Sequence, residues 1–208
     1  MKLREVAAKL PMFPSSALKF QPRSGSYQKS EYFLNLYKIP GCIIAADGTI
    51  SKTGNVDLRR FKGQTLPVRF GSVSGDFDVR DTSLTSMVGF PRHVGGSLKL
   101  NQTPISSLDG IPQMIGGDAY LLDTDIHSLS GISKKVESIG GTVVIGGSQT
   151  HVLGLLEIRG VQQIIITSLM NGTDSPVAVI LNKYIGTGDI ISAQDELIDA
   201  GCKEQARL

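Results

Sequence analysis

Apolar and polar residues alternate in short runs that recur along the middle of the chain. Each run begins with a glycine and has apolar residues at the second and fourth positions after it. Five copies start 21, 21, 21 and 24 residues apart: Gly54-Val56-Leu58, Gly75-Phe77-Val79, Gly96-Leu98-Leu100, Gly117-Ala119-Leu121 and Gly141-Val143-Ile145. A fixed step in this range is typical of a solenoid. The pattern predicts a mostly β repeat solenoid over residues 54–169.

Further positions recur in the three copies that begin at Gly75, Gly96 and Gly117. A threonine follows the glycine by seven residues, at Thr82, Thr103 and Thr124. Its hydroxyl can bond backbone groups that the bend after the strand leaves unpaired, and the glycine suits a tight or left-handed backbone. Because one copy cannot bury its own apolar residues, we expect stacked copies to form a parallel sheet over a continuous core.

The segment before the repeats predicts an N-terminal cap, residues 1–53. Residues 2–10 have the apolar spacing of a short helix, and residues 12–30 carry the prolines and serines of an exposed loop. Asp47-Gly48 between two apolar runs predicts a hairpin. We expect this cap to cover the apolar edge of the first coil.

The segment after the repeats predicts a helical cap, residues 170–208, continuous with the solenoid. Residues 164–166 indicate one last strand. Ser175 as N-cap before Pro176 predicts a helix. A second helix is expected to begin at Ser192, which with Asp195 resembles a capping box.

Composition is that of a soluble folded protein. Of 208 residues, 40% are hydrophobic and 19% are charged. No run approaches the roughly 18 apolar residues that cross a membrane, and charges near the N-terminus do not fit a signal peptide. Cys42 and Cys202 lack the spacing of a zinc site or a disulfide scaffold. We expect a cytoplasmic protein with two free thiols.

Charge is divided unevenly along the chain. Residues 1–69 hold twelve Lys or Arg against four Asp or Glu, a net of +8, and the remaining residues have a net of −6. The basic part can indicate an acidic partner such as nucleic acid, or merely two unlike faces of one molecule. The candidate nucleic-acid residues are Lys19, Arg23, Lys29, Lys38, Arg59, Arg60 and Lys62.

Sequence motifs of enzymes are missing. There is no phosphate-binding Gly-x-x-x-x-Gly-Lys-Ser/Thr, no dinucleotide-binding Gly-x-Gly-x-x-Gly after a strand, and no Gly-x-Ser-x-Gly. The three histidines, His93, His127 and His151, do not recur at one repeat position with other ligands. We therefore expect no catalytic activity, cofactor, metal site or small-molecule substrate.

The remaining candidate is the outward face of the repeat strands. If Phe77 and Val79 point into the core, the residues between and beside them point out, and neighbouring copies align them in rows. A rigid face of this kind suits protein recognition, with Tyr120, Leu122 and Val144 as an apolar centre. The candidate partner-binding residues are Asp57, Arg59, Asp76, Asp78, Arg80, Lys99, Asn101, Asp118, Tyr120 and Leu122.

The run Phe77-x-Val79-x-x-Thr82-x-Leu84-x-x-Met87 resembles the leucine-rich-repeat signature, with threonine in place of asparagine or cysteine. The resemblance covers about half of the chain. The copies are short, and proline and glycine follow the strand. We therefore expect an irregular leucine-rich-repeat-like array with extended or 3₁₀ return segments.

The C-terminal run from Ile180 to Gly201, behind repeats such as Ser107 to Pro112, looks like the uncharacterised repeat proteins of large tailed bacteriophages. This resemblance implies a phage protein acting in the cytoplasm of an infected bacterium. It favours a non-enzymatic inhibitor of a host defence or toxin enzyme, such as a nuclease or a DNA ADP-ribosyltransferase. The alternatives are a nucleic-acid-associated protein and a phage structural component.

Overall fold

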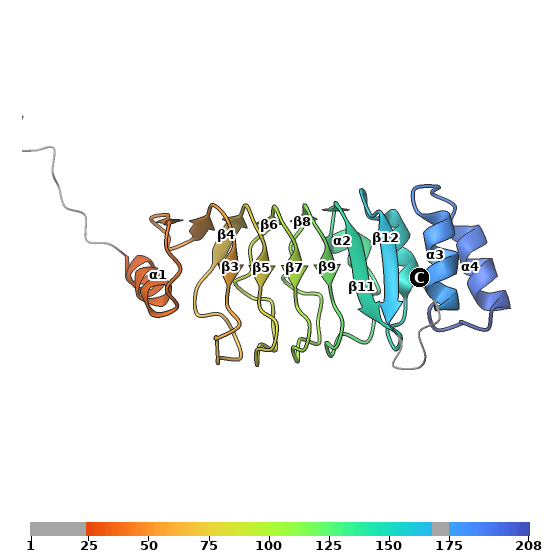
Figure 1. The fold of residues 1–208 in the computed structure, drawn as a ribbon, viewed down its shortest axis with the longest axis horizontal. Coiled ribbons are helices and arrows are strands. Elements are labelled where there is room, and N and C mark those ends of the chain that lie inside the picture. Colours follow the sequence, from red (N-terminus) through yellow and green to blue (C-terminus); the bar gives the residue numbers. More distant parts are fainter. Residues whose placement is uncertain (1–23, 168–174) are drawn as a thin grey trace, which may run out of the picture.

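The protein is an elongated stack of coils with a helix at one end and two helices at the other (Figure 1). The computed structural model describes residues 24–167 and 175–208. Helix α1 (Gly25–Leu36) lies at the N-terminal end, and α3 (Pro176–Tyr184) and α4 (Ile190–Asp199) lie at the C-terminal end. The predicted mostly β solenoid is confirmed.

One wall of the stack is a six-stranded parallel sheet, which we call the outer sheet. Alternating buried residues align from coil to coil, with Val56 beside Phe77, Phe77 beside Leu98 and so on to Ile164. The 21-residue step fixes this register, since a slip by one residue would turn the apolar side chains outward. Its strands are β3 (Val56–Asp57), β5 (Phe77–Asp78), β7 (Leu98–Lys99), β9 (Ala119–Tyr120), β11 (Thr142–Gly146) and β12 (Gln163–Thr167).

The opposite wall is a second six-stranded sheet, which the sequence pattern did not predict. Its strands bury apolar residues, including Val73, Val94 and Ile115, against the same core. The first two strands are antiparallel and form the predicted hairpin at Asp47-Gly48, which is confirmed. The strands are β1 (Cys42–Ile44), β2 (Ile50–Lys52), β4 (Phe70–Val73), β6 (His93–Val94), β8 (Met114–Ile115) and β10 (Ser138–Ile139).

The last coils are less regular. A short helix α2 (Ile132–Lys135) precedes β10, and a 3₁₀ helix η1 (Val152–Glu157) follows β11. The predicted 3₁₀ return segment is therefore present after β11, where η1 is the one 3₁₀ helix among residues 24–167 and 175–208.

The bends after β5, β7 and β9 have the chemistry that the threonine pattern predicted. The hydroxyls of Thr82 and Thr103 donate to the carbonyl oxygens of Val79 and Leu100, both at 2.7 Å. The residue before each threonine takes a left-handed backbone, as at Asp81 with φ 58°. Bends of successive coils thus stack with their polar groups satisfied.

The predicted left-handed backbone is confirmed at Gly54, which has φ 90°, whereas Gly75, Gly96, Gly117 and Gly141 are required for a different reason. At Gly96 the backbone is not left-handed. Instead, a Cβ there would lie 2.4 Å from Oδ1 of Asp76 in the preceding coil. Close stacking of coils, rather than backbone conformation, excludes a side chain at this position.

The N-terminal cap differs in part from the prediction. The expected helix at residues 2–10 lies outside the described residues, and the expected loop at residues 12–30 is wrong from Gly25 onward because α1 begins there. Ser24 caps this helix by accepting from the N–H of Tyr27 at 3.1 Å, and Phe33 packs onto the first coil. Phe33 and Tyr37 therefore pack at the end of the core, whereas Tyr32 is 70% exposed.

The C-terminal helices close the other end. The helix at Ser175-Pro176 is confirmed as α3. The predicted start of the next helix at Ser192 is wrong, because Asp189 is the N-cap of α4 and its carboxylate accepts from the N–H of Ser192. Among the described residues, no helix is long and apolar enough to cross a membrane.

The two edge strands of the outer sheet differ in how their backbone groups are hydrogen-bonded. At the C-terminal edge, the amide of Asn182 in α3 bonds both backbone groups of Ile164 in β12, each at 2.8 Å. At the N-terminal edge, β3 has no strand neighbour on its outer side within the described residues. Among the described elements, the C-terminal edge of the sheet is therefore the one that its cap covers by hydrogen bonding.

Candidate protein-binding face

The outward side chains of the outer sheet lie in three rows, which together we call the outer face. Parallel strands about 4.8 Å apart make a row across six strands roughly 24 Å long. The middle row holds Asp57, Asp78, Lys99, Tyr120, Val144 and Ile165. The row before it holds Asn55, Asp76, Ser97, Asp118 and Thr142, and the row after it Arg59, Arg80, Asn101 and Leu122.

The row that precedes the middle row, from Asn55 to Thr142, forms a ladder of hydrogen bonds between coils. Oδ1 of Asn55 accepts from the N–H of Asp76, and Oδ1 of Asp76 accepts from the N–H of Ser97, both at 2.9 Å. Oδ1 of Asp118 accepts from the N–H of Thr142 at 2.8 Å. Asp76 and Asp118, which the sequence offered as partner-binding residues, therefore each commit one oxygen to holding coils together.

Charges on the N-terminal half of the face are paired with one another. Nη2 of Arg59 lies 2.7 Å from Oδ2 of Asp57, and Nη2 of Arg80 lies 2.7 Å from Oδ2 of Asp78. The hydrogen bond from Arg59 is the main cause that lowers the pKa of Asp57. These pairs fix long side chains in one arrangement, so the face displays ordered charge.

Asp78 is the least accessible of these charged residues. Its side chain is 10% exposed and also lies 3.8 Å from Nε of Arg59. A charge reversal there would place a cation against Arg59 and Arg80. Asp78 therefore belongs to the framework of the face rather than to its contact surface.

The C-terminal half of the face is more apolar. The hydroxyl of Tyr120 donates to Oδ2 of Asp118 at 3.0 Å, which is the main reason that the pKa of Tyr120 is raised. Leu122 is half-buried, and Ile165 is 38% exposed. Val144, expected in the apolar centre, is buried instead. Ile165 was not among the candidates from the sequence, although the alternation of residues 164–166 points its side chain outward.

Asn101 lies in the third row. Its buried Oδ1 atom has no hydrogen-bond partner in the described part of the chain. Because this oxygen is enclosed, it is not a contact atom for a partner.

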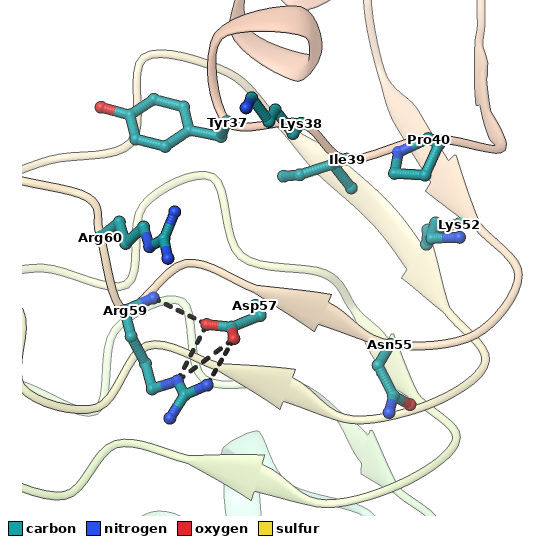
Figure 2. Close-up of a pocket in the computed structure, with 9 residues that line it drawn as sticks. All are labelled: Tyr37, Lys38, Ile39, Pro40, Lys52, Asn55, Asp57, Arg59 and Arg60. Atoms are coloured by element: carbon teal, nitrogen blue, oxygen red, sulfur yellow. Dashed lines mark hydrogen bonds and ion pairs between the residues drawn. The ribbon is translucent and has the colours of Figure 1, made fainter.

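The basic candidates do not form one surface. Lys19 and Arg23 lie outside the described residues, Lys29 borders a separate hollow near Asp47, and Lys62 is exposed in the loop after β3. Lys38, Arg59 and Arg60 do come together, joined by Lys52, which the sequence did not single out. They line a hollow of about 680 Å³, which we call the cationic hollow (Figure 2).

Groups of three or more His, Cys, Asp or Glu arranged to hold a metal ion are not found among residues 24–167 and 175–208. His151 instead contacts two hydroxyls through Nδ1, that of Thr150 at 2.9 Å and that of Ser128 at 3.1 Å.

Comparison with protein-family models, curated proteins and solved structures finds no match for this chain. The resemblance to leucine-rich repeats and to phage proteins rests on the sequence pattern alone.

The ion pair between Asp76 and Lys99 leads to a pH-dependent prediction. Nζ of Lys99 lies 2.6 Å from Oδ2 of Asp76, and this bond is the first cause that lowers the pKa of that carboxyl. A lowered folded pKa stabilises the protein above the unfolded value of about 3.9, and this contribution is lost as the pH falls through the folded pKa.

Asp76→Asn keeps an acceptor for Ser97 and removes the charge. We expect it to lower the free energy of unfolding by about 1 kcal/mol at pH 7, with the difference from the wild type shrinking below about pH 4. Urea denaturation between pH 7 and pH 2.5 measures this. The control is Asp195→Asn on the exposed side of α4. A difference that stays constant over this pH range would contradict the assignment.

Proposed function

We propose that this protein is a non-enzymatic, protein-binding solenoid that recognises its partner through the outer face. The supporting observation is the ordering of that face, where paired charges on β3, β5 and β7 adjoin an apolar region around Tyr120 and Ile165. A partner meets side chains that are already fixed, so little conformational entropy is lost on binding.

The two halves of the face have different roles in this proposal. Partly exposed apolar and aromatic groups surrounded by polar residues are the usual centres of binding energy. Tyr120, Leu122 and Ile165 supply such a centre. The paired charges of Asp57 and Arg59 lie toward the other end, where they favour a partner with complementary charge and discriminate against others.

The finer proposal concerns the partner. The resemblance to phage repeat proteins supports a host bacterial protein in the cytoplasm of an infected cell, and inhibition of a defence or toxin enzyme that cuts or modifies phage DNA. Nucleases and DNA ADP-ribosyltransferases are the first enzymes to test, by adding the purified protein to each activity assay.

The face itself is tested by a matched pair of variants. Ile165 on the outer sheet and Met114 on the opposite sheet are 38% and 44% exposed. In capture from bacterial lysate followed by titration of the captured protein, we expect Ile165→Glu and Tyr120→Ala each to weaken binding at least about tenfold. Met114→Glu should bind like the wild type.

Full retention of the partner by Ile165→Glu and Tyr120→Ala would rule out this face. If the protein instead bound DNA with an affinity that falls steeply as salt rises, the nucleic-acid alternative would replace the proposal.

A further inference from the structure

The cationic hollow lies beside the edge of β3, to which no other strand is paired among residues 24–167 and 175–208, at the N-terminal end of the outer sheet. Residues 37–40, which follow α1, form one wall of it, and Asn55, Asp57, Arg59 and Arg60 form the other (Figure 2). Its volume of about 680 Å³ is within the range of sites that hold a ligand of several groups.

Backbone groups of β3 face this hollow. The N–H groups of Val56 and Leu58 bond the carbonyl oxygens of Asp76 and Asp78 in the neighbouring coil, both at 2.8 Å. In an extended strand the intervening residue points its N–H and C=O the opposite way, so those of Asp57 face the open edge. An exposed strand edge is a template for another extended chain.

The charge around the edge is positive. The carboxylate of Asp57 is held by Arg59 and also attracts Arg60. The lining of the hollow nevertheless holds four cations, Lys38, Lys52, Arg59 and Arg60, against this one carboxylate. They come from three different segments, so the fold itself brings them together. An extended chain along β3 would pass its side chains near several cations.

The apolar part of the wall distinguishes a peptide from a nucleic acid. The ring of Tyr37 packs against Phe33 and Phe61, with ring centroids 4.7 Å and 5.6 Å away, and Ile39 is buried. Single-stranded nucleic acids usually need an open aromatic face on which bases stack. Here the aromatic ring is engaged in the core of the cap, while the backbone edge is open.

We propose that the cationic hollow binds an extended acidic peptide segment of a partner protein, which pairs with β3 as an additional strand and sets its carboxylates against Lys38, Lys52 and Arg60. Main-chain hydrogen bonds supply affinity in this mode and side-chain pockets supply specificity. The site does not depend on binding at the apolar half of the outer face.

The test uses the full chain and synthetic probes. The first probe is a peptide of about eight residues with alternating Glu and Val, a typical strand length; the others are its Lys–Val counterpart and an oligo(dT) of similar charge. In titrations followed by NMR, we expect the acidic peptide alone to bind, with the largest shifts at the amides of Asn55 and Asp57.

Two variant pairs separate charge from strand pairing. The double variant Lys38→Glu/Arg60→Glu should lower the affinity for the acidic peptide at least about tenfold. The control variant Lys203→Glu, at an exposed position near the C-terminal end, should leave that affinity unchanged. Asp57→Pro removes the edge N–H and should weaken binding, whereas Asp57→Ala keeps that N–H and should bind as well as the wild type or better. Thermal denaturation establishes that each variant folds.

Preference for oligo(dT), equal binding of the acidic and basic peptides, or equal affinity of Asp57→Pro and Asp57→Ala would each overturn the proposal. Because Lys38→Glu and Arg60→Glu alter no residue of the outer face, their failure to weaken the acidic peptide is distinguishable from failure of the proposed outer face.

Discussion

Replacing Gly116 with alanine should destabilise the protein by more than about 3 kcal/mol. A Cβ at Gly116 would lie 2.2 Å from the carbonyl oxygen of Gly95 and 2.9 Å from its carbonyl carbon. Both are backbone atoms of the preceding coil, so no side-chain rotation relieves the contact. The coils would have to move apart, which breaks the register of both sheets at the middle of the stack.

Gly146→Ala is the matched control for this prediction. Gly146 also lies in the solenoid, has no positive φ, and has nothing within 4 Å of the added Cβ. We expect its free energy of unfolding in urea to stay within about 0.5 kcal/mol of the wild type. Equal stability of Gly116→Ala and Gly146→Ala would mean that the coils are not stacked as closely as described.

Phe77→Ala should cost about 4 kcal/mol of stability. Phe77 is fully buried, and its ring contacts those of Phe70 and Phe90 with centroids 5.4 Å and 5.0 Å away. Phe70 in turn contacts Phe33 of α1 at 6.4 Å. Removing the ring therefore leaves a cavity in the aromatic cluster that joins the N-terminal helix to the first coils.

Phe77→Leu keeps most of the apolar volume and should cost only about 1 to 1.5 kcal/mol. Urea denaturation compares the two variants. In a solenoid each coil contacts only its neighbours, so hydrogen exchange in Phe77→Ala should increase in α1 and the first coils more than around β12. Uniform loss of protection along the chain would contradict the local role of the cluster.

The structure also changes how the outer face should be probed. From the sequence, Asp78→Lys is as reasonable a test of partner binding as Tyr120→Ala. Since the Asp78 side chain is 10% exposed and ion-paired with Arg80, its reversal would disturb the fold as well as any contact. Ile165→Glu avoids this ambiguity because the side chain is partly exposed at the surface.

The sequence by itself determined the solenoid, its core and its bends. The 21-residue step determines which residues of successive coils lie side by side. The alternation of apolar and polar residues determines which side chains point inward, as at Phe77 and Leu98. The threonine at the strand end acts on a carbonyl three residues back. These features depend on residues close in sequence or on an exact repeat, so they can be predicted from the sequence pattern alone.

Only the tertiary structure decided which outward groups are free. Whether a polar side chain is available depends on neighbours about one coil away, as with Asp76, whose oxygens bond Ser97 and Lys99. The second sheet, the close contact at Gly116 and the placement of Lys52 and Arg60 around one hollow likewise arise between segments that no local pattern connects. Periodicity specifies a direction for each side chain, and packing between coils specifies its partners.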